Sequence, residues 1–170
     1  MADNDTAAPN QDAATQAAGP QLIINAQYVK DLSFENPRAP QSLIQQTKQP
    51  EVGLNVDVKA RTLGQDMYEV MLTINANAQT DNEPVFLVEL SYGAVVTLQG
   101  ASEDMVAGAL LVETPRLMFP FARNIIADAT RDGGFPPLFI NPIDFADLLR
   151  REQQQRMAAG QGNGGDTAQA

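Results

Sequence analysis

The sequence predicts an α+β fold, a four-stranded antiparallel sheet with helices packed on one face. Three observations lead to this fold class. The first half of the chain alternates apolar and polar residues, as half-buried strands do, whereas the second half changes to helical spacing. The links between the strand candidates are short enough for antiparallel hairpins. Strands followed in sequence by helices are typical of folds whose helices gather on one face of such a sheet.

Period-two alternation predicts the individual strands. They are expected over residues 22–29, 52–58, 68–76, 85–92 and 94–99, the first of them as an additional edge strand. The turn-like link at 62–66 predicts that the strands on either side pair as a hairpin, and a second turn is expected at 80–83. Gly93 is expected to end the strand that begins at Val85.

Helical spacing and capping residues predict the second half. Ser102 is the expected N-cap of a first helix. Pro115 is expected to break that helix and to begin the next, which the Gly133–Gly134 pair then ends. Asn141 is expected to cap a last helix. The apolar side chains of the second and last helices share one face each, at Leu117, Phe121 and Ile125 and at Phe145, Leu148 and Leu149.

Length and composition are those of one globular domain with polar ends. The chain has 170 residues, 44% of them hydrophobic, and a formal net charge of -10. Residues 1–21 and 158–170 are mainly small and polar, and their only charges are acidic. We expect both to be disordered tails, because they can bury little apolar area. One folded domain remains over residues 22–157.

The residue types that the chain lacks exclude several classes of function. It contains no Cys and no His, which excludes thiol nucleophiles, disulfides, Ser-His triads and the usual zinc sites. No segment resembles a phosphate-binding or calcium-binding loop, so no metal and no cofactor are expected. The negative net charge disfavours nucleic acid as a partner. Without a signal peptide or an apolar stretch of about 18–20 residues, we expect a cytoplasmic protein that does not insert into membranes.

The strand predicted at 85–92 has two different faces. One face is fully apolar and the other combines apolar and polar side chains: Phe86, Val88, Leu90 and Tyr92 against Val85, Leu87, Glu89 and Ser91. The simpler interpretation is a central strand with one solvated glutamate. The alternative is that one face packs against helices while the other binds a partner.

Two further features leave alternatives open. Asp31 and Glu35 are four residues apart, which fits either a charged loop or a carboxylate pair of a small acid–base hydrolase, although no third catalytic group accompanies them. Five of the seven Phe residues lie in one quarter of the chain, beside a loop rich in Gly and Pro. They predict either an adaptable apolar groove or ordinary core packing. These residues are Phe119, Phe121, Phe135, Phe139 and Phe145.

An ordered set of motifs resembles the SecB family of protein-export chaperones. The most extended is YVKDLSFENPRAP at 28–40. The others follow in family order: PEV at 50–52, YEV at 68–70, FLVEL at 86–90, LMFPFAR at 117–123, GFPPL at 134–138 and NPIDF at 141–145. Together they span nearly all of the predicted domain, and the set is far more specific than any single motif.

The resemblance implies a fold, a function and site residues. It implies a homotetramer built as a dimer of dimers, which binds non-native precursor proteins without ATP and passes them to the translocation motor SecA. The implied SecA-binding residues are Asp31, Glu35, Leu87 and Glu89. The positions implied in tetramer assembly are Val88, Leu90 and Tyr92, and the aromatic residues implied in the client groove are Phe121, Phe135 and Phe145.

Two positions depart from the family pattern. Lys48 occupies a position where some members have a Trp that lines the client groove, which predicts a less aromatic groove end here. Phe121 replaces a Tyr and so lacks the hydroxyl. The sequence also leaves open a SecB-like chaperone or adaptor that serves another client, such as a toxin–antitoxin pair.

Overall fold

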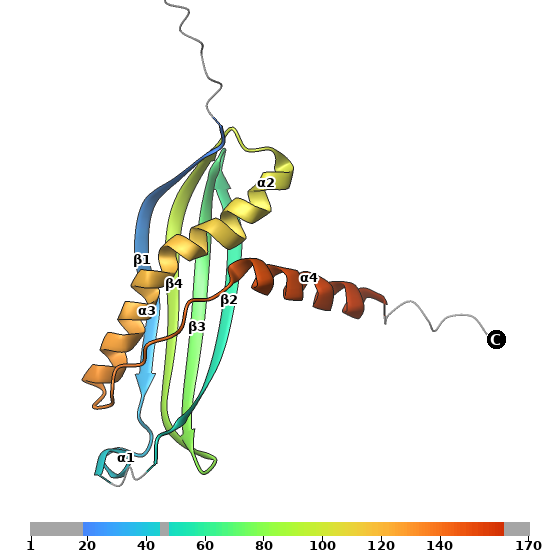
Figure 1. Cartoon of the computed structure of the whole chain (residues 1–170). Coiled ribbons are helices and arrows are strands. Elements are labelled where there is room, and N and C mark those ends of the chain that lie inside the picture. Colours follow the sequence, from blue (N-terminus) through green and yellow to red (C-terminus); the bar gives the residue numbers. More distant parts are fainter. Residues whose placement is uncertain (1–18, 45–47, 162–170) are drawn as a thin grey trace, which may run out of the picture.

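A four-stranded antiparallel sheet with strand order β1-β4-β3-β2 forms the centre of the protein (Figure 1). The computed structural model describes residues 19–44 and 48–161. The strands are β1 (Gln21–Glu35), β2 (Glu51–Gly64), β3 (Met67–Thr80) and β4 (Glu83–Gln99). The helical elements are α1 (Gln41–Ile44), α2 (Glu103–Gly108), η1 (Ala109–Glu113), α3 (Thr114–Asp132) and α4 (Phe145–Gln161). The predicted α+β class is confirmed.

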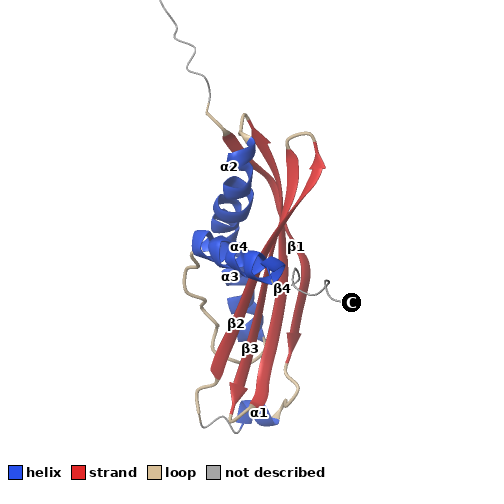
Figure 2. Cartoon of the chain, turned by 90° about the vertical axis from the view of Figure 1, so that its right-hand side faces the viewer, coloured by secondary structure: helices blue, strands red, loops and turns tan. Residues whose placement is uncertain are grey.

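The helices α2 and α3 lie on one side of the sheet, which leaves its other side open (Figure 2). We call these the helix face and the open face. On the helix face, the side chains of the two central strands are almost fully buried, including Val70, Leu72 and Ile74 of β3. From α3, Met118 and Ile126 pack onto them. This burial of apolar area stabilises the fold.

Two predicted strand boundaries are wrong. β1 continues to Glu35, so Asp31 and Glu35 lie in a strand and not in a loop. Gly93 does not end a strand, because β4 runs without interruption to Gln99. Gly93 instead makes room for the Tyr28 ring of β1, since a Cβ at this position would lie 2.5 Å from the ring's Cζ. The missing side chain therefore serves cross-strand packing.

Tight turns join the three strands that follow one another in sequence. Asp66 has a positive φ in the link between β2 and β3. Asp81 and Asn82 both have positive φ between β3 and β4, as a two-residue type I′ turn requires. The predicted turns at 62–66 and 80–83 are therefore close to where the chain reverses.

Pro115 does not break the helix as predicted. It cannot donate a backbone hydrogen bond, and the turn before it widens into the π-helical segment η1, so the helix continues from Glu103 to Asp132. The Ala109 carbonyl oxygen accepts the Thr114 backbone N–H across the widened turn, and it also accepts the Thr114 hydroxyl at 2.8 Å. Gly133 and Gly134 end the helix as predicted.

This continuous helix is also long and apolar enough, by length and composition alone, to cross a membrane, contrary to the expectation from the sequence. Its most apolar window has a mean hydropathy of 1.2 and is 33% buried within the chain. Core helices of soluble proteins meet the same criterion, so this is weak evidence for a membrane span.

The last helix begins later than expected and has another cap. Asp144, not Asn141, caps α4, because its carboxylate accepts a hydrogen bond from the Asp147 backbone N–H at 3.0 Å. α4 extends past the predicted domain end to Gln161. The tails predicted at 1–21 and 158–170 lie mostly outside the described residues.

Candidate protein-binding surfaces

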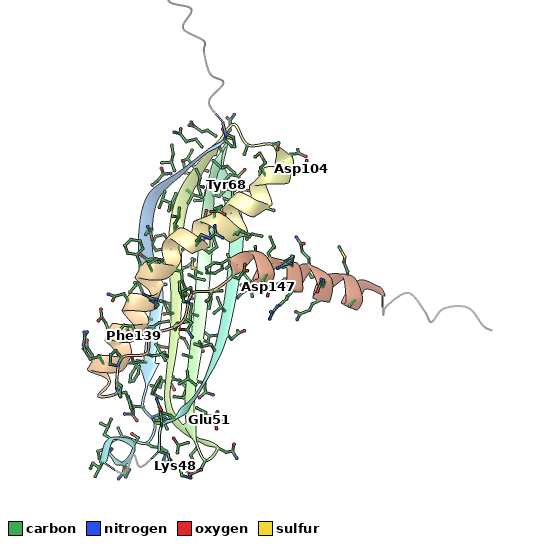
Figure 3. All side chains as sticks on the ribbon, viewed as in Figure 1. Lys48, Glu51, Tyr68, Asp104, Phe139 and Asp147 are labelled. Atoms are coloured by element: carbon green, nitrogen blue, oxygen red, sulfur yellow. The ribbon has the colours of Figure 1, made fainter. Side chains whose placement is uncertain are left out.

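Two adjoining apolar clefts follow β2 on the helix face and together form what we call the groove. The first has a volume of about 490 Å³ and is lined by Lys48, Gln49, Pro50, Val52, Phe86 and residues 135–138. The second, of about 430 Å³, shares Val52 and Leu138 with the first and continues past Leu54 and Phe139. Figure 3 shows Lys48 near the end of the sheet where β2 begins and Phe139 on the loop that connects α3 to α4.

Thr130 holds this connecting loop in place as the outer wall of the groove. Its side chain is fully buried, and its hydroxyl accepts a hydrogen bond from the Leu138 backbone N–H at 2.9 Å. The same hydroxyl donates toward the Ile126 carbonyl oxygen at 3.0 Å within α3. A loop rich in proline, with few backbone donors of its own, is thereby anchored to the helix.

The three Phe residues predicted for the groove lie in different environments. Phe135 lines the first cleft. Phe145 is only 2% exposed and packs edge-on against Phe119, with ring centroids 6.0 Å apart. Phe121 is 53% exposed on α3 and is not among the residues that line the two clefts. The lysine noted in the sequence does line the first cleft.

Sequence reasoning missed the groove residues contributed by β2. Val52 and Leu54 point to the helix face but remain 38% and 47% exposed, because no helix covers that end of the strand. Their alternation predicted only a half-buried strand. Which apolar positions stay uncovered depends on where the helices end, and this is not visible in a period-two pattern.

The four residues implied in SecA binding gather on the open face, and we call them the acidic patch. In the register of β1 and β4, Asp31 pairs with Ser91, and Glu35 pairs with Leu87. Glu89 lies between these pairs, opposite Ser33. Paired residues on adjacent strands share a face, so three exposed carboxylates lie on the open face, with Glu89 in the middle and the half-buried Leu87 at the Glu35 end.

The residues implied in tetramer assembly are buried within the chain. Val88 and Leu90 have 0% exposure and Tyr92 has 7%. They belong to the helix face, opposite Ala76, Ile74 and Leu72 of β3. The apolar face of β4 therefore packs against helices, as one of the two interpretations of this strand predicted.

A buried carboxylate on the open face connects three strands. Glu69 of β3 is 7% exposed and accepts hydrogen bonds from Arg61 Nε of β2 and from the Tyr28 hydroxyl of β1. The Lys30 ammonium lies 3.9 Å from the same carboxylate. The hydrogen bonds from Arg61 and Tyr28 lower the pKa of Glu69 from 4.5 to about 2. No signal in the sequence pointed to this cluster, since its members are far apart in the chain.

The Glu69 cluster predicts a specific pH dependence of stability. The pKa of Glu69 in the folded state lies below its ordinary value. The contribution of Glu69 to the unfolding free energy is therefore present above pH 4.5 and is lost as the pH falls from there toward about 2. We expect Glu69→Gln to reduce the loss of unfolding free energy over this window, measured by urea unfolding at a series of pH values. Parallel curves for the variant and the unchanged protein would contradict the assigned pKa.

An apolar groove on one face and an acidic patch on the other are features of a protein that binds other proteins. Among residues 19–44 and 48–161, no group of three or more Asp or Glu side chains is placed to hold a metal ion. The class defined by fold and surface is thus a protein-binding module.

Comparison with known proteins identifies the family. The family model described as preprotein translocase subunit SecB matches residues 15–156. A protein-export protein SecB from Maricaulis maris is 52% identical over 159 residues, covering 93% of this chain and 92% of the relative. The one from Rhodospirillum centenum is 47% identical and covers 93% and 96%. The chain belongs to the SecB family and is a protein-export chaperone.

A solved structure supports the fold independently of close sequence similarity. A SecB-like chaperone from Mycobacterium tuberculosis, in complex with an antitoxin peptide, matches with a TM-score of 0.61 at 13% identity. The match covers 72% of this chain and 90% of that one. At such low identity the likeness concerns the fold alone.

Proposed function

We propose that this chain holds non-native precursor proteins in the groove, without ATP, and delivers them to SecA through the acidic patch. The observation that supports this most directly is the placement of the two surfaces on opposite faces of one sheet. A client held on the helix face leaves the open face free, so client and motor can be bound at the same time. The proposed compartment is the cytoplasm, where precursors are made.

The groove suits an extended apolar segment. Its lining includes Phe139, which is 67% exposed, together with the partly exposed Val52 and Leu54. Burying such side chains yields about 25 cal/mol per Å² of apolar area, without requiring a particular client sequence. Binding at several such places along one client would raise the overall affinity.

The acidic patch suits a basic surface of the motor. Asp31, Glu35 and Glu89 supply negative charge, and Leu87 supplies an apolar contact beside Glu35 and Glu89. Complementary charge steers association and orients the partner. No bond-making chemistry is needed, and the hydrolase alternative is not favoured for a member of a chaperone family.

The proposed dimer-of-dimers assembly needs an apolar surface that the single chain leaves uncovered. Such side chains occur on the helix face of edge strand β1 and on α3, with exposures between 43% and 53% at Val29, Leu32, Leu117 and Phe121. Val88, Leu90 and Tyr92 would affect assembly indirectly, by placing α3 on the sheet. Light scattering coupled to size exclusion tests this proposal, and a stable monomer would contradict it.

The client-binding proposal is tested by a matched pair of leucine variants. Leu54→Asp places a charge in the groove and should weaken client binding by about tenfold or more, since burying a leucine contributes about 1.5–3 kcal/mol. Suppression of the aggregation of a denatured precursor, followed by light scattering, should fall accordingly. Leu63→Asp is the control, because Leu63 is 45% exposed against 47% for Leu54 and lines neither cleft. If the unmodified protein does not reduce the aggregation of the precursor, the proposal that this chain holds non-native proteins is contradicted.

A further inference from the structure

β1 carries an irregularity next to the acidic patch. Its register with β4 shifts between Val29 and Asp31, so Lys30 is an extra residue without a partner, as in a β-bulge. Bulges change the direction in which the following side chains point. Asp31, which directly follows Lys30, is the first member of the acidic patch.

Two anchors of β1 require the bulge. Tyr28 lies on the open face, with its ring over Gly93 and its hydroxyl on Glu69. Phe34 lies on the helix face, stacked on Phe86 with centroids 5.8 Å apart. Residues six apart in a regular strand share a face. Since these two point to opposite faces, one extra residue must lie between them.

The position of the extra residue decides where Asp31 points. With the bulge at Lys30, Asp31 shares the open face with Glu89. With the bulge one or more residues later, regular alternation from Tyr28 would direct Asp31 to the helix face instead. Glu35 is insensitive to this choice, because it directly follows the Phe34 anchor.

Glu69 contacts both residues that flank Val29 at the start of the bulge. It accepts the Tyr28 hydrogen bond and lies 3.9 Å from the Lys30 ammonium, while Arg61 holds it from the other side. We propose that Glu69 is a positioning residue for partner binding: it holds the bulge at Lys30 and thereby keeps Asp31 on the open face. This inference rests on the proposed function for its consequence, but its geometric part can be tested without SecA.

The geometric test uses introduced cysteines, since the chain has none of its own. Asp31→Cys with Ser91→Cys creates a cross-strand pair that can oxidise to a disulfide only when both side chains share a face. Adding Glu69→Gln should slow this oxidation by about twofold or more, because a bulge distributed over several positions keeps residue 31 on the open face only part of the time. Loss of free thiols under a mild oxidant gives the rate.

A second cysteine pair and an arginine variant provide the controls. Glu35→Cys with Leu87→Cys should oxidise at the same rate with or without Glu69→Gln, because Phe34 holds that end of the strand. Arg61→Gln removes a partner of Glu69 but leaves its contacts with Tyr28 and Lys30, so it should not slow the first pair. Equal rates for the first pair with Glu and Gln at position 69 would overturn the inference. If Glu69→Gln prevents folding, Gly93→Ala, which displaces the Tyr28 ring, is used in its place.

The functional test is a double-mutant cycle on the affinity for purified SecA. Glu69→Gln alone should weaken binding by about threefold, and it should have no further effect in an Asp31→Asn background. Additive effects would overturn the positioning role. If Asp31→Asn alone leaves SecA binding unchanged, the docking role of Asp31 fails, whereas the cysteine rates still decide the role of Glu69.

Discussion

Glu89→Lys is expected to weaken the binding of SecA by about tenfold or more while leaving client binding unchanged. Glu89 is an exposed carboxylate on β4, beside Leu87 and between Asp31 and Glu35 in the sheet register. Reversing its charge replaces an attraction to a basic partner by a repulsion at the centre of the acidic patch. The remaining affinity should also depend less on salt, because one favourable charge interaction is lost. Isothermal titration calorimetry with purified SecA at two salt concentrations measures both effects.

Glu103→Lys is the matched control for this change. It alters the net charge of -10 by the same amount, but Glu103 lies in the first turn of α2, away from the open face. Equal weakening by both variants would attribute the effect to net charge and contradict a localised docking site. Loss of client binding by Glu89→Lys would indicate a folding defect.

Phe145→Ala is expected to lower the free energy of unfolding by about 3–5 kcal/mol, because it leaves a cavity where a fully packed aromatic ring had been. Phe145 is the first residue of α4, and its ring lies edge-on against Phe119 of α3. It therefore attaches the last helix to the core. Urea unfolding at equal protein concentrations measures the change, since assembly would otherwise contribute to the apparent stability.

Phe139→Ala is expected to affect client binding and not stability, in contrast to Phe145→Ala. Phe139 is 67% exposed on the groove wall, so its removal should change the unfolding free energy by about 0.5 kcal/mol or less and should weaken client binding instead. Together the two variants separate a core phenylalanine from a groove phenylalanine. A stability loss for Phe139→Ala as large as that for Phe145→Ala would contradict this division.

The alternation of strand residues predicted faces correctly where strands are regular and failed where they are not. In β4 the pattern separated Val88 and Leu90 from Leu87 and Glu89, and the structure places these pairs on opposite faces. In β1 the same rule would have put Asp31 and Tyr28 on opposite faces, whereas the bulge at Lys30 brings them to the same one. A bulge depends on partners in other strands, so a local pattern does not reveal it.

Local preferences of glycine and proline predict two interruptions that the structure does not have. Gly93 and Pro115 were both expected to interrupt an element, and neither does. Gly93 accommodates the Tyr28 ring of the neighbouring strand β1, and Pro115 is tolerated because the helix widens before it. In each case the surroundings of the residue, and not its own preference, decide whether the element continues.

By itself, the sequence determined the fold class, the order of strands and helices, the family and the acidic character of the chain, because these follow from composition, periodicity and ordered motifs. Only the tertiary structure decided which apolar residues fill the core and which remain in the groove, since burial depends on where α3, α4 and their connecting loop cover the sheet. It also decided that Glu69 lies against Tyr28, Lys30 and Arg61, because contacts between distant segments form only when the strands pair in register.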